Sequence, residues 1–250
     1  MRIKSILLSL SAIAALSAGA AHASANLVSN GGFEATSNGT NKQLASSATT
    51  AGNRTTVLDW TSSNGNDGGY NFVLASSIAN TWDSALWLNG QNNGYSASAN
   101  GGNFLASDQL YYPGTISQSI SGLTVGKQYT LTFDYALAQQ VGFTGVNADN
   151  YWQVGFGSSL QNTQQLTIAS GGFSGWKDAS MTFTATGTSE VLSFLAKGTP
   201  TGAPPFLLLD GVSMVSAVPE PATWGMLLGG LGLVGFIARR RKLAAPANAI

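Results

Sequence analysis

The chain has 250 residues and no formal net charge, and it contains no cysteine and a single histidine, His22. The absence of cysteine excludes disulfides, thiolate nucleophiles and cysteine-ligated metals. Residues 26–217 hold ten acidic and five basic residues, so this segment has a formal charge near −5. A mildly acidic segment without a basic cluster argues against binding to nucleic acid.

Residues 1–25 have the pattern of a secretory signal peptide. Two basic residues precede an apolar run at 6–20, and Ala23 and Ala25 each end a small-x-small cleavage pattern. These features predict a helical signal segment that is removed after export, so that the mature protein begins near residue 26. The alternative is a buried N-terminal helix. Removal of the signal would also remove His22.

Residues 26–217 contain many short segments in which apolar and polar side chains alternate between turns rich in Gly, Asn and Ser. The clearest of these segments span 128–135, 151–156, 179–185 and 190–195, and weaker candidates lie at 27–28, 57–61, 70–75, 85–88, 115–120, 165–168 and 206–215. Residues 34–56 are rich in Ser, Thr, Asn and Ala and predict a long exposed loop. The pattern predicts one all-β domain, a jelly-roll β-sandwich.

Four sequence landmarks stand out in this segment. They are N-G-G-F-E at 30–34, L-D-W-T at 58–61, I-S-Q-S-I-S-G-L-T-V-G-K-Q-Y-T-L-T-F at 116–133 and L-L-D-G-V-S at 208–213. Together they resemble galactose-binding-like β-sandwiches, a group that includes several carbohydrate-binding modules. The resemblance implies a fold in which the first and last strands lie close together. Residues 122–127 are expected to form a turn between two antiparallel strands.

The same resemblance implies a structural Ca²⁺ ion where the first and last strands meet. Glu34 and Asp210 are the matching carboxylates, and backbone carbonyl groups would have to complete the coordination shell. Members of this group often carry a second acid after the late aspartate, whereas this chain has Gly211 there. The alternative is that Glu34 is solvated and that Asp210 shapes a bend.

The expected mature domain, residues 26–217, contains neither histidine nor cysteine. This composition excludes histidine-dependent catalytic triads and ordinary zinc sites. The spacing of the ten acids singles out no carboxylate pair for glycoside hydrolysis, so we expect no catalytic residue. A carbohydrate-active hydrolase remains an alternative.

A sugar-binding face needs exposed aromatic rings that stack on sugar rings, with amides nearby to bond the hydroxyl groups. Candidate rings in loop-like contexts are Trp82, Trp87, Tyr95, Tyr111 and Tyr112. Tyr111 and Tyr112 precede Pro113 and Gly114 at an expected loop end, and Gln109 is close in sequence. The alternative is that these rings fill the second face of the sandwich. We expect core positions for Trp60, Trp152 and Trp176.

The C-terminal region combines prolines, an apolar run and a basic cluster. Pro219, Glu220 and Pro221 precede the uncharged run 222–238, which is followed by Arg239, Arg240, Arg241 and Lys242. As a helix, the run would rise about 25 Å, at the low end for crossing a bilayer core. Because basic clusters stay on the cytoplasmic side, the pattern predicts a transmembrane helix, an outer domain and a cytoplasmic tail at 243–250.

This tripartite order resembles the PEP-CTERM sorting signal over residues 218–242. The resemblance implies recognition by an exosortase, a membrane enzyme that could remove the anchor, in bacteria that make exopolysaccharide and biofilm. We therefore expect an exported protein that is anchored in the inner membrane, or released to the cell surface or matrix after processing. Its sandwich would bind glycan such as exopolysaccharide; the alternative is a purely structural or adhesive envelope protein.

Overall fold

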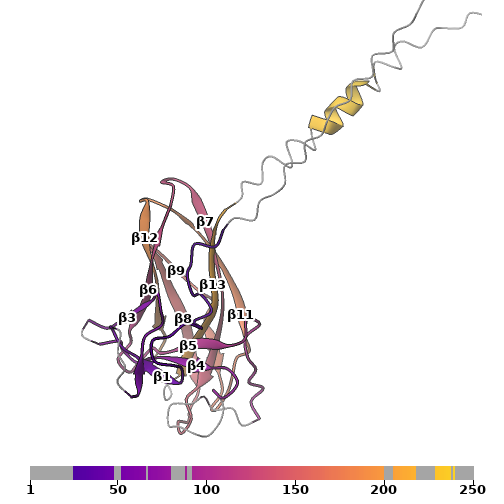
Figure 1. Cartoon of the computed structure of the whole chain (residues 1–250). Coiled ribbons are helices and arrows are strands. Elements are labelled where there is room, and N and C mark those ends of the chain that lie inside the picture. The colour runs from indigo at the N-terminus through magenta and orange to yellow at the C-terminus, as the bar shows by residue number, and fades with distance from the viewer. Residues whose placement is uncertain are drawn as a thin grey trace, which may run out of the picture.

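The structure is a computed structural model that describes most of the chain between residues 25 and 217. The described residues are 25–47, 52–65, 67–79, 88, 92–199, 205–217, 229–237 and 239. Within them, thirteen strands form two sheets that pack face to face (Figure 1). The expected all-β sandwich is therefore confirmed.

The first sheet has seven strands in the order β11-β7-β13-β5-β4-β1-β2. Its members are β1 (Lys42–Leu44), β2 (Arg54–Thr55), β4 (Asn71–Ala75), β5 (Asn103–Asp108), β7 (Gln128–Gln139), β11 (Lys177–Thr184) and β13 (Pro205–Ser216). Neighbouring strands are antiparallel, except that β1 and β2 are parallel. The register of β13 on β7 shifts between Asp210 and Ser213, so Gly211 and Val212 lie at an irregularity.

The second sheet has the order β10-β8-β12-β6-β3, with β9 paired to β8. Its strands are β3 (Thr61–Ser63), β6 (Thr115–Ser121), β8 (Asn147–Phe156), β9 (Ser159–Asn162), β10 (Leu166–Ile168) and β12 (Ser189–Lys197). The four clearest predicted strands correspond to β7, β8, β11 and β12.

Other sequence-based expectations were wrong in detail. The predicted loop at 34–56 contains β1 and β2, which form one edge of the seven-stranded sheet. Residues 27–28 form no strand. The sequence analysis also missed β5 and β9. Of the candidate strand at 85–88, only residue 88 lies among the described residues.

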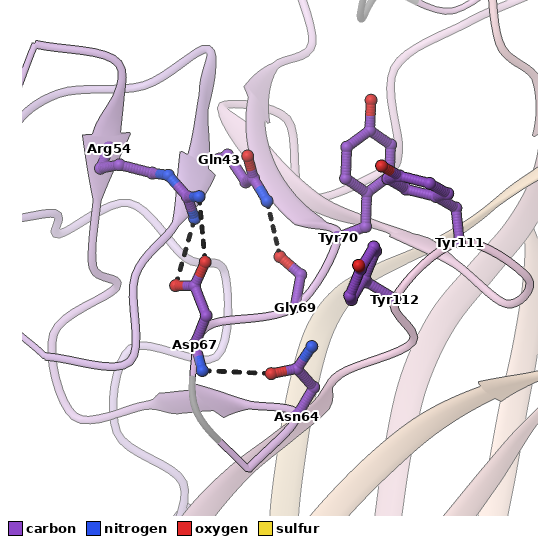
Figure 2. A pocket seen from close by; sticks show the side chains of 8 residues that line it. All are labelled: Gln43, Arg54, Asn64, Asp67, Gly69, Tyr70, Tyr111 and Tyr112. Carbon is purple, nitrogen blue, oxygen red and sulfur yellow. Dashed lines mark hydrogen bonds and ion pairs between the residues drawn. The ribbon is translucent and has the colours of Figure 1, made fainter.

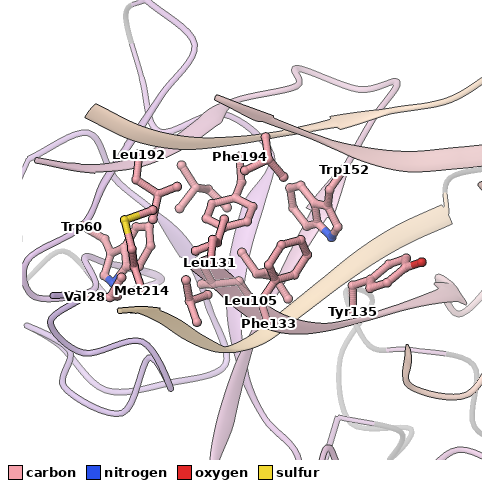
Figure 3. Packing of buried hydrophobic residues seen from close by; sticks show 14 of the residues in the cluster. Val28, Trp60, Leu105, Leu131, Phe133, Tyr135, Trp152, Leu192, Phe194 and Met214 are labelled. Carbon is pink, nitrogen blue, oxygen red and sulfur yellow. The ribbon is translucent and has the colours of Figure 1, made fainter. Parts of the chain in front are cut away.

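Apolar side chains of both sheets meet in the main core (Figure 3). Alternation along each strand points every second side chain into this layer. The ring of Phe194 on β12 lies 5.2 Å from that of Phe133 on β7, 6.0 Å from Trp152 and 6.2 Å from Trp60. Trp152 is completely buried and Trp60 nearly so, as expected.

A second apolar cluster covers the opposite face of the seven-stranded sheet. Its buried members are Phe72, Leu74, Ala79, Leu88, Phe104, Ala106, Ala136, Ala138, Phe206 and Leu208. Trp176 packs against this cluster and donates from Nε1 to the carbonyl oxygen of Ser96 at 2.9 Å. The central strands of this sheet are therefore buried on both faces, which explains why β5 and β13 lack a clear polar alternation.

Residues 122–127 form a turn, but the expectation that it joins two paired strands was wrong. The turn leads from β6 in one sheet to β7 in the other. The backbone N–H of Thr124 donates to the hydroxyl oxygen of Tyr129 at 2.9 Å, and that of Gly126 donates to the Ala185 carbonyl at 2.8 Å. These bonds hold an arch between the sheets.

The N-terminal segment runs beside β13. The N–H of Leu27 donates to the Met214 carbonyl at 2.8 Å, and that of Val212 donates to the Gly31 carbonyl at 2.9 Å. A Cβ atom at Gly31 would overlap the carbonyl oxygen of Val212. Glycine is thus required at this position of the N-G-G-F-E landmark, and the close approach brings Glu34 near Asp210.

At the C-terminal end, residues 229–237 are helical. Nine helical residues rise about 13 Å, less than half of a bilayer core. The part of the chain that the structure describes holds no helix with the length and apolar character needed to cross a membrane. Of the transmembrane helix expected at 222–238, only residues 229–237 lie among the described residues, and they do not form such a helix.

Several predicted features lie outside the described residues. They include the signal segment up to residue 24 with Ala23, the sorting residues Pro219, Glu220 and Pro221, and the basic residues Arg240, Arg241 and Lys242. Ala25 and Arg239 are described and exposed. The predicted boundaries of the signal peptide, outer domain, sorting segment and tail stay predictions.

Candidate functional site

A pocket of about 550 Å³ lies where β1 and β2 meet the loop between β3 and β4 and the loop between β5 and β6. It is lined by Gln43, Arg54, Asn64, Asp67, Gly69, Tyr70, Tyr111 and Tyr112. Figure 2 shows the three tyrosine rings on one side and the Arg54–Asp67 pair on the other. Tyr111 and Tyr112, two of the rings expected from the sequence to contact glycan, both line this pocket.

The tyrosines form a connected aromatic wall. The ring of Tyr111 lies 5.0 Å from that of Tyr70 and 4.8 Å from that of Tyr112, each pair nearly perpendicular. Tyr111 is 57% exposed and Tyr112 is 62% exposed. Tyr70 is anchored beneath them, with its ring 4.6 Å from that of Phe72 in the second apolar cluster. The exposed rings of Tyr111 and Tyr112 are thus supported by Tyr70, which packs against the second apolar cluster.

Asp108, at the end of β5, shapes the loop that carries these rings. Its Oδ1 accepts hydrogen bonds from the N–H groups of Leu110 at 2.7 Å and Tyr111 at 2.9 Å. The carboxyl group is completely buried, and its Oδ2 has no hydrogen-bond partner. Burial raises the pKa of Asp108, while the two N–H donors act in the opposite direction. The carboxyl group therefore positions the start of the tyrosine loop.

A buried amide holds the two loops together under the pocket. Asn71 Nδ2 donates to Ser62 Oγ at 2.8 Å and to the Gly114 carbonyl oxygen at 3.0 Å. Gly69 has a φ of +72°, and a Cβ atom there would lie 2.7 Å from Gly114 Cα. The N–H of Tyr70 also donates to the Tyr112 carbonyl oxygen at 2.8 Å. This backbone contact sets the spacing between the two loops.

The opposite wall is polar. Arg54 Nη2 lies 3.0 Å from Asp67 Oδ2, and Nη1 lies 3.3 Å from Oδ1, so the pair is bidentate. Arg54 Nη1 also donates to the Leu44 carbonyl oxygen at 3.0 Å. Gln43 Nε2 donates to the Gly69 carbonyl oxygen at 2.8 Å. The polar wall therefore carries an amide and a guanidinium group opposite the tyrosine rings.

Tyr95, the other aromatic candidate among the described residues, does not line this pocket. Tyr95 packs against Phe173 with a ring distance of 5.3 Å and donates its hydroxyl hydrogen to the Ser76 carbonyl at 3.1 Å. It belongs to the cover of the second apolar cluster, which is the alternative weighed from the sequence. Trp82 and Trp87 lie outside the described residues, so their role stays a prediction.

The predicted calcium ligands come together where the N-terminal segment meets β13. Glu34 Oε1 and Asp210 Oδ1 each lie 3.9 Å from the point that a Cβ atom at Gly32 would occupy. Glu34 Oε1 accepts from the N–H of Asn103 at 2.8 Å. Asp210 Oδ1 accepts from the N–H of Gly211 at 2.7 Å, and its Oδ2 accepts from the Ser98 hydroxyl. One oxygen of each carboxylate thus lies near the same point beside Gly32.

Asp210 is completely buried, and further acids lie nearby. Burial raises its pKa to about 7, with smaller contributions from the charges of Asp134 and Glu34. Asp134 on β7 lies directly between Asp210 on β13 and Asp178 on β11. Burial, followed by the Asp178 carboxyl group, raises the pKa of Asp134.

A calcium ion needs more oxygen ligands than Glu34 and Asp210 supply. The described residues contain no group of three or more His, Cys, Asp or Glu side chains placed to hold a metal. Calcium accepts carbonyl and water oxygens beside one or two carboxylates. A calcium ion beside Gly32 would have Glu34 and Asp210 as its carboxylate ligands and would need carbonyl or water oxygens for the rest of its shell.

Comparison with known proteins identifies the C-terminal segment. Residues 217–242 match the PEP-CTERM protein-sorting motif. No curated protein matches the chain.

Similar solved structures include modules that bind carbohydrate. One is TmCBM61 in complex with β-1,4-galactotriose, at 15% identity over 78% of this chain and 100% of that one, with a TM-score of 0.43. Another is the CBM22-1 xylan-binding domain of Xyn10C from Paenibacillus barcinonensis, at 15% identity over 80% and 100%, with a TM-score of 0.40. The chain therefore carries a PEP-CTERM sorting motif, as expected from its sequence, and its structural neighbours include carbohydrate-binding modules with β-sandwich folds.

Proposed function

We propose that this protein is an exported surface protein, sorted by an exosortase, whose sandwich binds glycan and catalyses no reaction. The observation that carries the binding function is the pocket of Tyr70, Tyr111 and Tyr112 opposite Arg54 and Gln43. Exposed rings can stack on the apolar faces of sugar rings, while the polar wall bonds their hydroxyl groups. The biofilm matrix is the setting that we propose for this binding.

The sorting proposal rests on the PEP-CTERM match at 217–242. In cells that contain an exosortase, mass spectrometry of the isolated protein should show a species without residues 1–25 and without the apolar run at 222–238. The same protein from cells lacking the enzyme should keep residue Ile250 and serves as the control. If all of the protein in exosortase-containing cells still ended at Ile250, processing at the motif would be refuted.

The glycan proposal predicts that substitution of a pocket ring weakens binding. On a glycan array, followed by titration of the hits, Tyr111→Ala should lower affinity by up to about tenfold, because one stacked ring contributes roughly 0.5–1.5 kcal/mol. Tyr151→Ala makes the same chemical change on β8 of the other sheet and should leave affinity unchanged. An array without hits would favour a structural or adhesive protein, and turnover of a polysaccharide would favour a hydrolase.

We also propose that Glu34 and Asp210 bind a structural calcium ion. The proposal is supported by the approach of Glu34 Oε1 and Asp210 Oδ1 to the same point beside Gly32, and by the burial of Asp210. A divalent cation would favour the ionised form of Asp210, whose pKa is raised by burial and, to a smaller extent, by the charges of Asp134 and Glu34. Calcium should therefore stabilise the fold most where Asp210 is ionised.

A further inference from the structure

The charged groups of the tyrosine pocket balance one another. Arg54 is the one cationic residue among those that line it, and Asp67 is the one acidic residue. The two form a bidentate pair across the polar wall, with N–O distances of 3.0 and 3.3 Å (Figure 2). A sugar that enters the pocket therefore meets a guanidinium group whose charge is already neutralised.

Local bonds hold both members of this pair in place. Arg54 Nη1 is bonded to the Leu44 carbonyl oxygen at 3.0 Å, beside the short parallel pairing of β1 and β2. The N–H of Gly68 donates to Asp67 Oδ1 at 2.6 Å, and the N–H of Asp67 donates to Asn64 Oδ1 at 3.1 Å. The carboxylate is thus aimed at Arg54 by its own turn.

This arrangement decides which sugars the pocket can accept. A guanidinium group is the side chain best suited to bind a carboxylate, through two parallel hydrogen bonds. Here Asp67 occupies that position, so the carboxylate of a uronic acid would have to displace it or lie beside it. Specific sites commonly reject a competitor by placing a like charge where the competitor would bind.

We propose that Asp67 is a specificity-determining residue, which occupies Arg54 and thereby restricts the pocket to neutral sugars. The inference rests on the proposed glycan-binding function and names the class of ligand. Neutral hexose and pentose units meet the tyrosine rings and the amide of Gln43 without an electrostatic penalty. Uronic acids are excluded by the carboxylate of Asp67.

The experiment compares neutral and acidic oligosaccharides on the full chain. The probes are galactan and mannan oligomers and, as acidic counterparts, galacturonan and mannuronan oligomers. The wild-type protein should bind at least one neutral oligomer and bind its acidic counterpart at least tenfold more weakly. Asp67→Asn should raise affinity for the acidic oligomer at least tenfold, with a gain that falls at high salt, and should change neutral binding less than threefold.

A matched control separates this effect from a change in net charge. Asp149→Asn removes one exposed acid on β8 in the other sheet, and asparagine tolerates the φ of +56° at that position. It should leave acidic binding unchanged. Equal wild-type affinity for neutral and acidic oligomers, or a gain in Asp67→Asn no larger than in Asp149→Asn, would overturn the inference and leave glycan binding intact. Failure of the wild-type protein to bind either class would instead overturn the proposed function.

Discussion

Between pH 4 and pH 7 the free energy of unfolding should fall by as much as about 4 kcal/mol because of one group, Asp210. Burial raises its pKa from 3.8 to about 7 in the folded protein, and each unit corresponds to about 1.4 kcal/mol. The folded state therefore keeps a proton in this range that the unfolded state has lost. Since the folded state binds more protons, stability decreases as the pH rises and levels off above pH 7.

The measurement is urea unfolding at several pH values in the presence of EDTA. Asp210→Asn should flatten the slope between pH 4 and pH 7, because its amide stays neutral throughout. Asp149→Asn, which changes an exposed acid on β8, should keep the wild-type slope. An unchanged slope in Asp210→Asn would show that the proton is held elsewhere.

Calcium in place of EDTA tests the proposed ion site within the same experiment. The ion should stabilise the wild-type protein at pH 7 and have little effect near pH 4, where Asp210 is protonated. The stabilisation should disappear in Asp210→Asn and in Glu34→Ala. An equal midpoint with calcium and with EDTA at pH 7 would rule out a structural calcium ion.

Replacing Trp152 by alanine should cost about 3–5 kcal/mol of stability, the range for loss of a large buried aromatic side chain. Trp152 is completely buried between the sheets, where its ring lies 6.0 Å from that of Phe194 (Figure 3). Its Nε1 donates to the Leu208 carbonyl oxygen at 3.0 Å, so the side chain also links β8 to β13. The substitution would leave a cavity and remove this hydrogen bond.

Urea unfolding monitored by circular dichroism gives the loss directly. Trp152→Phe keeps an aromatic ring in the core and should cost less than half as much, since it mainly removes the hydrogen bond and part of the volume. A loss below about 1 kcal/mol in Trp152→Ala would mean that the core collapses around the missing side chain. It would contradict the close packing described for the main core.

The sequence predicts those strands that are covered on one face only. In β7, β11 and β12, apolar and polar residues alternate because one face meets the core and the other meets solvent over much of the strand. All six residues of β5 are buried, including Asn103, Ser107 and Asp108, so no alternation marks it as a strand. Burial on both faces, which depends on distant segments, removed the local signal.

Half of the pocket had a local signal and half had none. Tyr111 and Tyr112 stand before Pro113 and Gly114, a pattern that predicts exposed rings at a loop end. Arg54 and Asp67 are far from them in sequence and reach the pocket only because β1 pairs with both β2 and β4. Of these three strands, the short β1 and β2 lie inside the predicted loop at 34–56.

The direction of β13 determines which end of the sandwich faces away from a surface to which the C-terminal part of the chain is attached. Ser216 lies at one end of this strand, while Phe206, opposite Asp108, lies at the other. The two positions are separated by roughly 30 Å of extended chain. The N-terminal segment at Leu27 returns to the Ser216 end through its bond to Met214. If the chain were attached to a surface beyond residue 217, the end of the sandwich that carries Tyr111 would therefore point away from that surface.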